Sequence, residues 1–266
     1  MNTGPLRDEG PGGPGQAVEG QSARSDDTPS GPAPPSAAAP RARSDQDLRP
    51  PTRGELAWYR LCWSLLWGPC WLVWRAKVVG RENLPTTTPY VLAPVHRSYI
   101  DTVLTAYLTP HRHRFMAKSG VFDKPWRAKV FGSLGAFPVR RGTADREALG
   151  VCERALAVGE SLVLYPEGTR GSGPVLRPLL NGPAFLALRA NVPIVPVGIG
   201  GSERSMPIGA KWLRPTHVAM VVGKPIWPPP SPGTARVPRR VVDELTDRLR
   251  SELQAVFDEA RSLAGV

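Results

Sequence analysis

From residue 78 onward, short apolar runs alternate with stretches of helical periodicity, and this alternation restricts the chain to few folds. Strands that alternate with helices are typical of an α/β domain with a largely parallel sheet. We therefore expect residues 80–266 to form an α/β domain whose largely parallel sheet is flanked by helices. The expected strands are residues 90–93, 115–117, 136–139, 161–165, 194–199 and 218–222. The expected helices are residues 99–108, 125–132, 144–158, 183–189 and 238–263.

A histidine and an aspartate, His96 and Asp101, follow the first of these strands. The two residues are five positions apart. Histidine moves protons near neutral pH, and a carboxylate on its other ring nitrogen holds the required tautomer. On one straight helix the two side chains would point about 140° apart, so they meet only if His96 lies in a loop and Asp101 in the first helical turn. Ser98 is a good N-cap three residues before Asp101, which gives Asp101 a purely structural interpretation as well.

A pair of arginines, Arg140 and Arg141, directly follows the expected strand at 136–139. Ligands of α/β sheets gather beyond the carboxyl ends of strands, and guanidinium groups grip phosphate with two hydrogen bonds. The pair is therefore either a phosphate clamp or a solvated basic loop.

A third polar cluster follows the expected strand at 161–165. Its members are Glu167, Gly168, Thr169 and Arg170. They offer a carboxylate, close backbone approach to a ligand, a hydroxyl and a positive charge. The segment is not a phosphate-binding P-loop, because the lysine and its spacing are absent. Alone it is either a ligand-binding turn or a plain turn.

Taken in order, these clusters resemble the motifs of the glycerophospholipid acyltransferase family, whose common activity is the acylation of lysophosphatidic acid. The matching segments are VHRSYID at 95–101, GAFPVRR at 135–141, YPEGTRGS at 165–172 and VPIVPVGI at 192–199. The resemblance covers residues 90–225, and four motifs in the family's order make a chance match improbable.

The resemblance implies that His96 removes the proton from an acceptor hydroxyl as that oxygen attacks an acyl thioester. Asp101 would orient His96, and coenzyme A or acyl carrier protein would leave. The implied substrates are a lysophospholipid acceptor and acyl-CoA or an acylated carrier protein; no cofactor and no metal are implied. The substrate-binding residues would be Arg141, Glu167, Gly168, Thr169 and Arg170.

Three positions depart from the family pattern. Val95 stands where asparagine is usual, Tyr165 where phenylalanine is usual, and Leu180 where the family often has lysine. The first two changes are conservative enough to keep the site. The third leaves open an acceptor other than 1-acyl-sn-glycerol-3-phosphate, such as a different lysolipid or a glycolipid.

Residues 54–79 are expected to form an interfacial helical segment. Five of the eight tryptophans lie there: Trp58, Trp63, Trp67, Trp71 and Trp74. The last four are spaced 4, 4 and 3, so a helix would place them in one stripe. Indole prefers the membrane–water interface, and the basic residues that flank the run suit anionic headgroups. The alternative is a helix buried against the core. Gly68-Pro69 is expected to divide the segment into two short helices.

The net charge of +11 points to an anionic partner. Residues 1–53 hold six arginines and seven acidic residues, so the rest of the chain has 28 basic and 16 acidic side chains, a net charge of +12. An anionic membrane surface or a phosphorylated substrate fits this charge. Nucleic acid is not expected, because basic and aromatic residues are not interleaved and no recognition motif is present. A non-catalytic lipid-binding protein is the alternative from another class, but it gives no reason for His96 with Asp101.

The remaining features bear on location. Residues 1–53 lack aromatic residues and are rich in Pro, Gly, Ala and Ser, so we expect a disordered tail. No apolar run is long enough for a conventional transmembrane helix, and a signal-peptide pattern is absent. Three cysteines, Cys62, Cys70 and Cys152, suggest reduced thiols. We therefore expect a peripheral or monotopic protein on the cytoplasmic face of the cell membrane.

Overall fold

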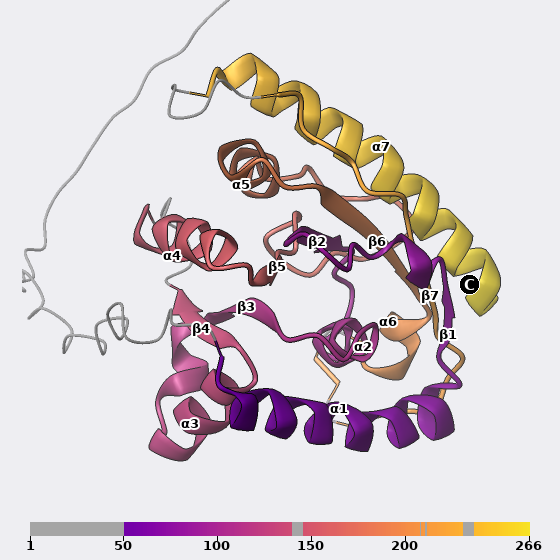
Figure 1. The fold of residues 1–266 in the computed structure, drawn as a ribbon. Helices are drawn as coiled ribbons and strands as arrows, with labels where there is room; N and C mark the ends of the chain where they lie inside the picture. The colour runs from indigo at the N-terminus through magenta and orange to yellow at the C-terminus, as the bar shows by residue number, and fades with distance from the viewer. Residues whose placement is uncertain (1–50, 140–145, 208, 211, 231–236) are drawn as a thin grey trace, which may run out of the picture. The chain divides into compact units, whose positions relative to one another are not determined.

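The computed structural model describes residues 51–139, 146–207, 209–210, 212–230 and 237–266. These residues contain a seven-stranded sheet with the strand order β1-β7-β6-β2-β5-β3-β4 (Figure 1). The strands are β1 (Lys77–Val79), β2 (Val91–Pro94), β3 (His113–Lys118), β4 (Ala136–Val139), β5 (Ser161–Val163), β6 (Ile194–Gly200) and β7 (Ala219–Val222). The helices are α1 (Arg53–Trp74), α2 (Asp101–Tyr107), α3 (Pro125–Ser133), α4 (Arg146–Ala157), α5 (Gly182–Ala190), α6 (Ser202–Ser205) and α7 (Arg239–Ala264), with 3-10 turns η2 (Arg81–Asn83) and η3 (Ser119–Phe122). The first 50 residues of the expected tail (1–53) lie outside the described residues.

The α/β fold expected from the sequence is confirmed. All neighbouring strands pair in parallel except β6 and β7, which are antiparallel. In the centre, Val91 of β2 pairs with Leu162 of β5 and Ile194 of β6. Five strands, from β4 to β6 in the sheet order, therefore run in one direction and bring their carboxyl ends to one edge.

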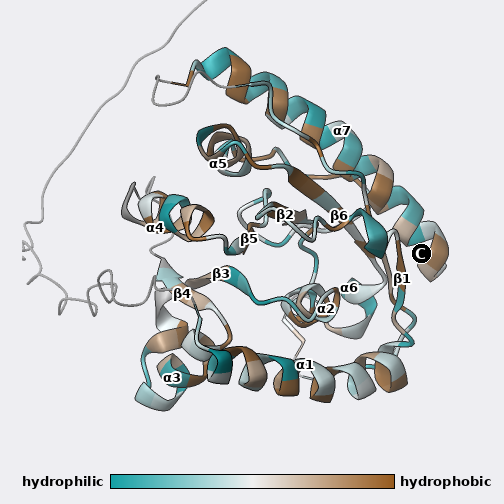
Figure 2. Ribbon diagram, viewed as in Figure 1, coloured by the Kyte–Doolittle hydropathy of each residue, from teal (hydrophilic) through white to brown (hydrophobic). Residues whose placement is uncertain are grey.

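Helices cover both faces of the sheet (Figure 1). Val91 and Ala93 of β2 belong to a core cluster with residues of α4, α5 and α7. Leu92, between them, belongs to the cluster on the other face, with residues of α1 and α2. This follows from the strand period of two, which turns successive side chains to opposite faces. Hydrophobic and hydrophilic residues alternate along α7 in Figure 2, as expected of an amphipathic outer helix.

The expected division of the tryptophan segment at Gly68-Pro69 is wrong, because α1 runs unbroken from Arg53 to Trp74. Proline at position 69 removes one backbone donor, but the helix continues because its last turns are held by packing. Cys70 is fully buried, and the buried Trp74 donates a hydrogen bond from Nε1 to Ser205 Oγ at 2.7 Å. Residues 77–79, assigned to the helical segment from the sequence, instead form the edge strand β1, which is too short to leave a periodic signal.

The tryptophans of α1 do not share one environment. Trp74 is buried, and Trp63 is half-buried and donates a hydrogen bond to the Tyr107 carbonyl oxygen at 3.3 Å. Trp67 and Trp71 keep 46% and 60% of their surface exposed. The outer side of α1 is nevertheless apolar, since Trp58, Leu61, Leu65 and Leu72 are also exposed. One side of α1 therefore packs on the core, and the other side is apolar and exposed. Docking of this segment at a membrane interface stays a prediction.

Close packing of α7 on β6 depends on glycine in the strand. A Cβ atom at Gly198 would collide with the backbone carbonyl of Val256 in α7, and one at Gly200 would collide with that of Ala260. Because the colliding atoms belong to the backbone of α7, no flexible side chain could move aside to admit the added Cβ.

We expect Gly198→Ala to lower the free energy of unfolding by about 1–3 kcal/mol, because the helix must lift from the sheet to admit the methyl group. Gly132→Ala is the matched control: a Cβ there meets nothing within 4 Å, and alanine in α3 should leave stability equal or slightly higher. Urea unfolding measures both, and equal midpoints for wild type and Gly198→Ala would contradict the packing argument.

Candidate active site

The candidate site lies where β2 and its parallel neighbour β5 end. His96 lies two positions beyond the end of β2, and the segment from Tyr165 to Arg170 follows β5. Two backbone hydrogen bonds hold the loops in place: Val95 N–H donates to the Val197 carbonyl at 3.0 Å, and Gly171 N–H donates to the His96 carbonyl at 2.8 Å. The predicted location at the carboxyl edge of the sheet is thus the observed one.

The structure brings His96 and Asp101 together. His96 Nδ1 lies 3.0 Å from Asp101 Oδ2, and the same oxygen accepts the backbone N–H groups of Arg97 and Ser98, each at 2.6 Å. Asp101 is fully buried, whereas the His96 side chain is 13% exposed. With Nδ1 donating to a carboxylate, Nε2 is the ring nitrogen that can accept a proton. This geometry suits a general base held by an orienting acid.

Ser98 is not the N-cap that the sequence suggested. Helix α2 begins at Asp101 with Ile100 in the N-cap position and no side-chain cap. Ser98 Oγ instead donates to the Met206 carbonyl at 2.8 Å, linking this loop to the segment after α6. Only half of a capping box remains, the bond from Ser98 N–H to Asp101. The carboxylate of Asp101 closes the turn itself, which is why it can face His96.

A buried ion pair between Arg97 and Glu167 joins the two loops. Arg97 Nη1 lies 2.8 Å from both Glu167 carboxylate oxygens, and neither side chain is more than 1% exposed. Glu167 also accepts the backbone N–H groups of His96 at 3.2 Å and Arg177 at 3.0 Å. These four bonds occupy the carboxylate, so the structure places Glu167 as a support beneath the site. Sequence reasoning missed Arg97, whose only signal was its position beside His96.

The other residues of the PEGTR turn are more open. Gly168 and Thr169 are exposed, and Gly168 has φ of +66°, a conformation that favours glycine. The exposed Leu180 side chain lies where a Cβ on Gly168 would be. Arg170 is half-buried, with its guanidinium carbon 3.6 Å from the centre of the Tyr99 ring. Arg170 Nη1 is buried, and no hydrogen-bond partner is found for it among the described residues. This leaves Arg170 with donor capacity for an anionic group.

Tyr165, noted in the sequence only as a departure from the family's phenylalanine, is a neighbour of His96. Its ring stacks on the imidazole with the centroids 4.1 Å apart and the planes inclined by 27°. Burial, and then the charge of Asp101, raise the pKa of the Tyr165 hydroxyl above its ordinary value. Tyr165 therefore stays protonated and is no candidate base.

Arg141 lies outside the described residues, so its predicted role in substrate binding stays a prediction. No group of three potential metal ligands is found in the described part of the chain. Burial raises the pKa of the Cys152 thiol to about 12, which makes this cysteine a poor nucleophile. Burial also lowers the pKa of His113 to about 4, and its Nε2 lies 2.9 Å from the Tyr90 hydroxyl. These groups belong to the core.

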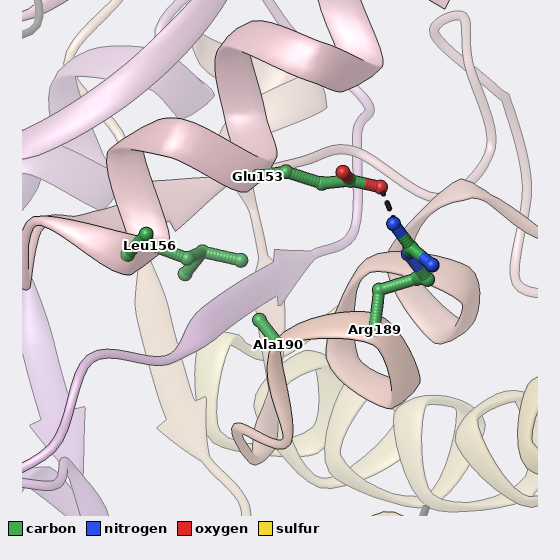
Figure 3. A pocket seen from close by; sticks show the side chains of 5 residues that line it. Glu153, Leu156, Arg189 and Ala190 are labelled. Carbon is green, nitrogen blue, oxygen red and sulfur yellow. Dashed lines mark hydrogen bonds and ion pairs between the residues drawn. The ribbon is translucent and has the colours of Figure 1, made fainter. Parts of the chain in front are cut away.

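A small pocket of about 200 Å³ lies elsewhere, between α4 and α5 (Figure 3). It is lined by Glu153, Leu156, Ala157, Arg189 and Ala190. Glu153 and Arg189 form an ion pair across it at 3.3 Å. Because it includes no residue of the two site loops, we assign it no part in the chemistry.

Comparison with known proteins gives the same class as the motifs of the sequence. The Acyltransferase family model matches residues 75–200. A chloroplastic 1-acyl-sn-glycerol-3-phosphate acyltransferase of Brassica napus is 29% identical over 158 residues, 58% of this chain and 46% of its own length. The 1-acyl-sn-glycerol-3-phosphate acyltransferase of Bacillus subtilis is 28% identical over 151 residues, 56% of this chain and 73% of its own. The chain therefore spans about half the length of the Brassica napus protein.

The fold has a solved counterpart. The crystal structure of the 1-acyl-sn-glycerophosphate acyltransferase PlsC from Thermotoga maritima matches with a TM-score of 0.60 and 22% identity, covering 77% of this chain and 78% of that one. At this identity the likeness concerns the fold. Residues 75–200 thus match the model of the acyltransferase family, the class that the motifs of the sequence resemble.

We expect Arg97→Met to lower the free energy of unfolding by roughly 3–5 kcal/mol, because it leaves the Glu167 carboxylate buried without its cation. The double variant Arg97→Met/Glu167→Gln should recover part of this loss. Arg240→Met is the control: its ion pair with Glu244 is 3.4 Å long and exposed, so stability should hardly change. Denaturant unfolding measures all three, and an Arg97→Met protein as stable as wild type would show that the pair is not needed.

Proposed function

We propose that this chain is an acyltransferase that moves a fatty acyl group from acyl-CoA, or from acyl carrier protein, to the free hydroxyl of a lysophospholipid. The acceptor that its relatives' names suggest is 1-acyl-sn-glycerol-3-phosphate, and the product is then phosphatidic acid. The observation that carries the proposal is the bond between His96 Nδ1 and the buried Asp101, which leaves Nε2 to act on a substrate.

The proposed reaction needs one proton acceptor. His96 Nε2 takes the proton of the acceptor hydroxyl as its oxygen attacks the thioester carbonyl carbon. Asp101 stabilises the imidazolium that forms. When the carbon–sulfur bond of the tetrahedral intermediate breaks, the imidazolium returns the proton to the departing sulfur, giving an ester and a free thiol. General-base help of this kind contributes roughly 10²–10⁴-fold.

Arg170 is the described residue best placed to hold the polar head of the acceptor. It combines a positive charge with a buried, unpartnered Nη1 at the PEGTR turn, beside Gly168 and Thr169. We propose that Arg141 contributes a second charge. Leu180, exposed against Gly168 where the family often has lysine, favours a second candidate: acyl transfer to another lysolipid or a glycolipid.

We further propose that the protein works as a peripheral or monotopic protein on the cytoplasmic face of an anionic membrane. No helix in the described ranges is long and apolar enough to cross a bilayer. Apolar side chains are nevertheless exposed on α1, and on α3 Trp126, Val130 and Phe131 are exposed as well. Trp58 Nε1 of α1 donates to Ser133 Oγ of α3 at 3.2 Å, so the two helices are joined. The three free cysteines suit the reducing side of the membrane.

We expect His96→Ala to abolish acyl transfer, a loss of roughly 10²-fold or more, because it removes the base. The variant should remain folded, since Asp101 keeps the backbone N–H groups of Arg97 and Ser98 as hydrogen-bond donors. The experiment incubates purified protein and variant with labelled acyl-CoA and a panel of lysolipids and glycolipids, and identifies each product. Turnover by His96→Ala at the wild-type rate would refute the mechanism. If the wild-type protein acylates an acceptor that has no phosphomonoester, the second candidate function is the correct one. If it forms no product but still binds lipid, the protein is a non-catalytic lipid-binding protein.

We expect Leu65→Ala/Trp71→Ala to weaken binding to anionic vesicles at least about tenfold, because each buried apolar side chain contributes roughly 1.5–3 kcal/mol. Trp227→Ala removes a tryptophan of similar exposure from another segment and should bind as wild type does. Vesicle sedimentation, with zwitterionic vesicles as comparison, measures the affinities. Equal losses in the two variants would show that α1 is not the contact surface.

A further inference from the structure

The stacking of Tyr165 on His96 is the second contact that holds the imidazole ring, beside its hydrogen bond to Asp101. The bond from His96 Nδ1 to Asp101 fixes one ring nitrogen, but one hydrogen bond leaves the ring able to swing about its attachment. A second contact on the ring face is needed to define its plane. Tyr165 makes that contact, with the centroids 4.1 Å apart and the planes inclined by 27°.

The Tyr165 ring is itself held at its far end. Its hydroxyl lies 3.3 Å from Thr105 Oγ1 and 3.5 Å from Thr102 Oγ1. Both threonines belong to α2, the helix that begins with Asp101. Thr105 Oγ1 donates to the Asp101 carbonyl at 2.7 Å, so the lone pairs of Thr105 and Thr102 are both open to the single phenolic proton of Tyr165. The aromatic ring that contacts His96 is therefore tied to the helix that carries its carboxylate partner.

We propose that Tyr165 is a positioning residue of the acyl-transfer site, whose ring face holds the plane of the His96 imidazole and whose hydroxyl ties that ring to α2. The inference rests on the proposed function, in which His96 Nε2 is the base. When His96 takes up the acceptor proton, the imidazolium lies against the electron-rich face of a phenol ring, an arrangement that stabilises a cation. The ring thus favours both the orientation and the charge that the transfer step requires.

Two substitutions separate the ring from its hydroxyl. Tyr165→Leu removes the stacking surface, and we expect kcat to fall about tenfold, with KM for both substrates within twofold of wild type. Tyr165→Phe keeps the surface and loses only the tie to α2, so kcat should stay within about threefold of wild type. Tyr90→Leu is the matched control for loss of a buried tyrosine, because Tyr90 lies directly before β2, at the opposite end of the strand from His96. This variant should lose stability and keep its kcat.

A spectroscopic measurement tests the stack without reference to activity. The chain has four histidines, and the ring proton signals of His96 are those missing from the spectrum of His96→Ala. A phenol ring at this distance shifts these signals upfield. The shift should persist in Tyr165→Phe and Tyr90→Leu and disappear in Tyr165→Leu.

The outcomes are distinguishable. Full activity of His96→Ala would remove the proposed function, whereas the ring-current shift would still report whether Tyr165 holds His96. If His96→Ala is inactive and Tyr165→Leu keeps its kcat, the inference about Tyr165 fails alone. A Tyr165→Phe variant as slow as Tyr165→Leu would overturn it too, because the ring face would then not be the active element.

Discussion

The buried ion pair between Arg97 and Glu167 is the interaction on which the arrangement of the site depends. It joins the loop after β2 to the loop after β5, and its carboxylate also accepts the backbone N–H of His96. Taking two charges out of water is costly, and further hydrogen bonds offset that cost. Here backbone groups of two segments supply them: the Glu167 carboxylate accepts from His96 and Arg177, and Arg97 donates to the carbonyls of His96 and Val175. The pair therefore aligns the histidine motif with the PEGTR turn.

Much of this architecture could be predicted, because the information is local. The six expected strands and the five expected helices recur in the structure with small shifts of their ends, since each has its own apolar pattern and its own boundaries. The meeting of His96 with Asp101 could also be predicted, because only a loop followed by a first helical turn satisfies their spacing.

What could not be predicted depends on partners distant in the sequence. Glu167 was expected to bind substrate, yet Arg97, 70 positions away, occupies its carboxylate. Ser98 was expected to cap α2, yet its hydroxyl bonds to Met206, 108 positions away. Tyr165 had no pattern that would connect it to an imidazole. The continuity of α1 through Pro69 likewise depends on the burial of Cys70 and Trp74, which a proline rule does not include.

Helix α1 has a consequence for how the enzyme would meet its lipid. Its inner side supplies Cys70 and Trp74 to the same core cluster as the sheet, while its outer side is apolar and uncovered. Such a helix cannot sink into a bilayer without opening the core that it closes. If α1 docks as proposed, it would act as a fixed spacer: contact would stop at the outer half of this one helix, and the sheet would keep His96 at a constant height above the headgroups. On the proposed docking, the acceptor hydroxyl would have to move to the base, because the base could not approach the bilayer.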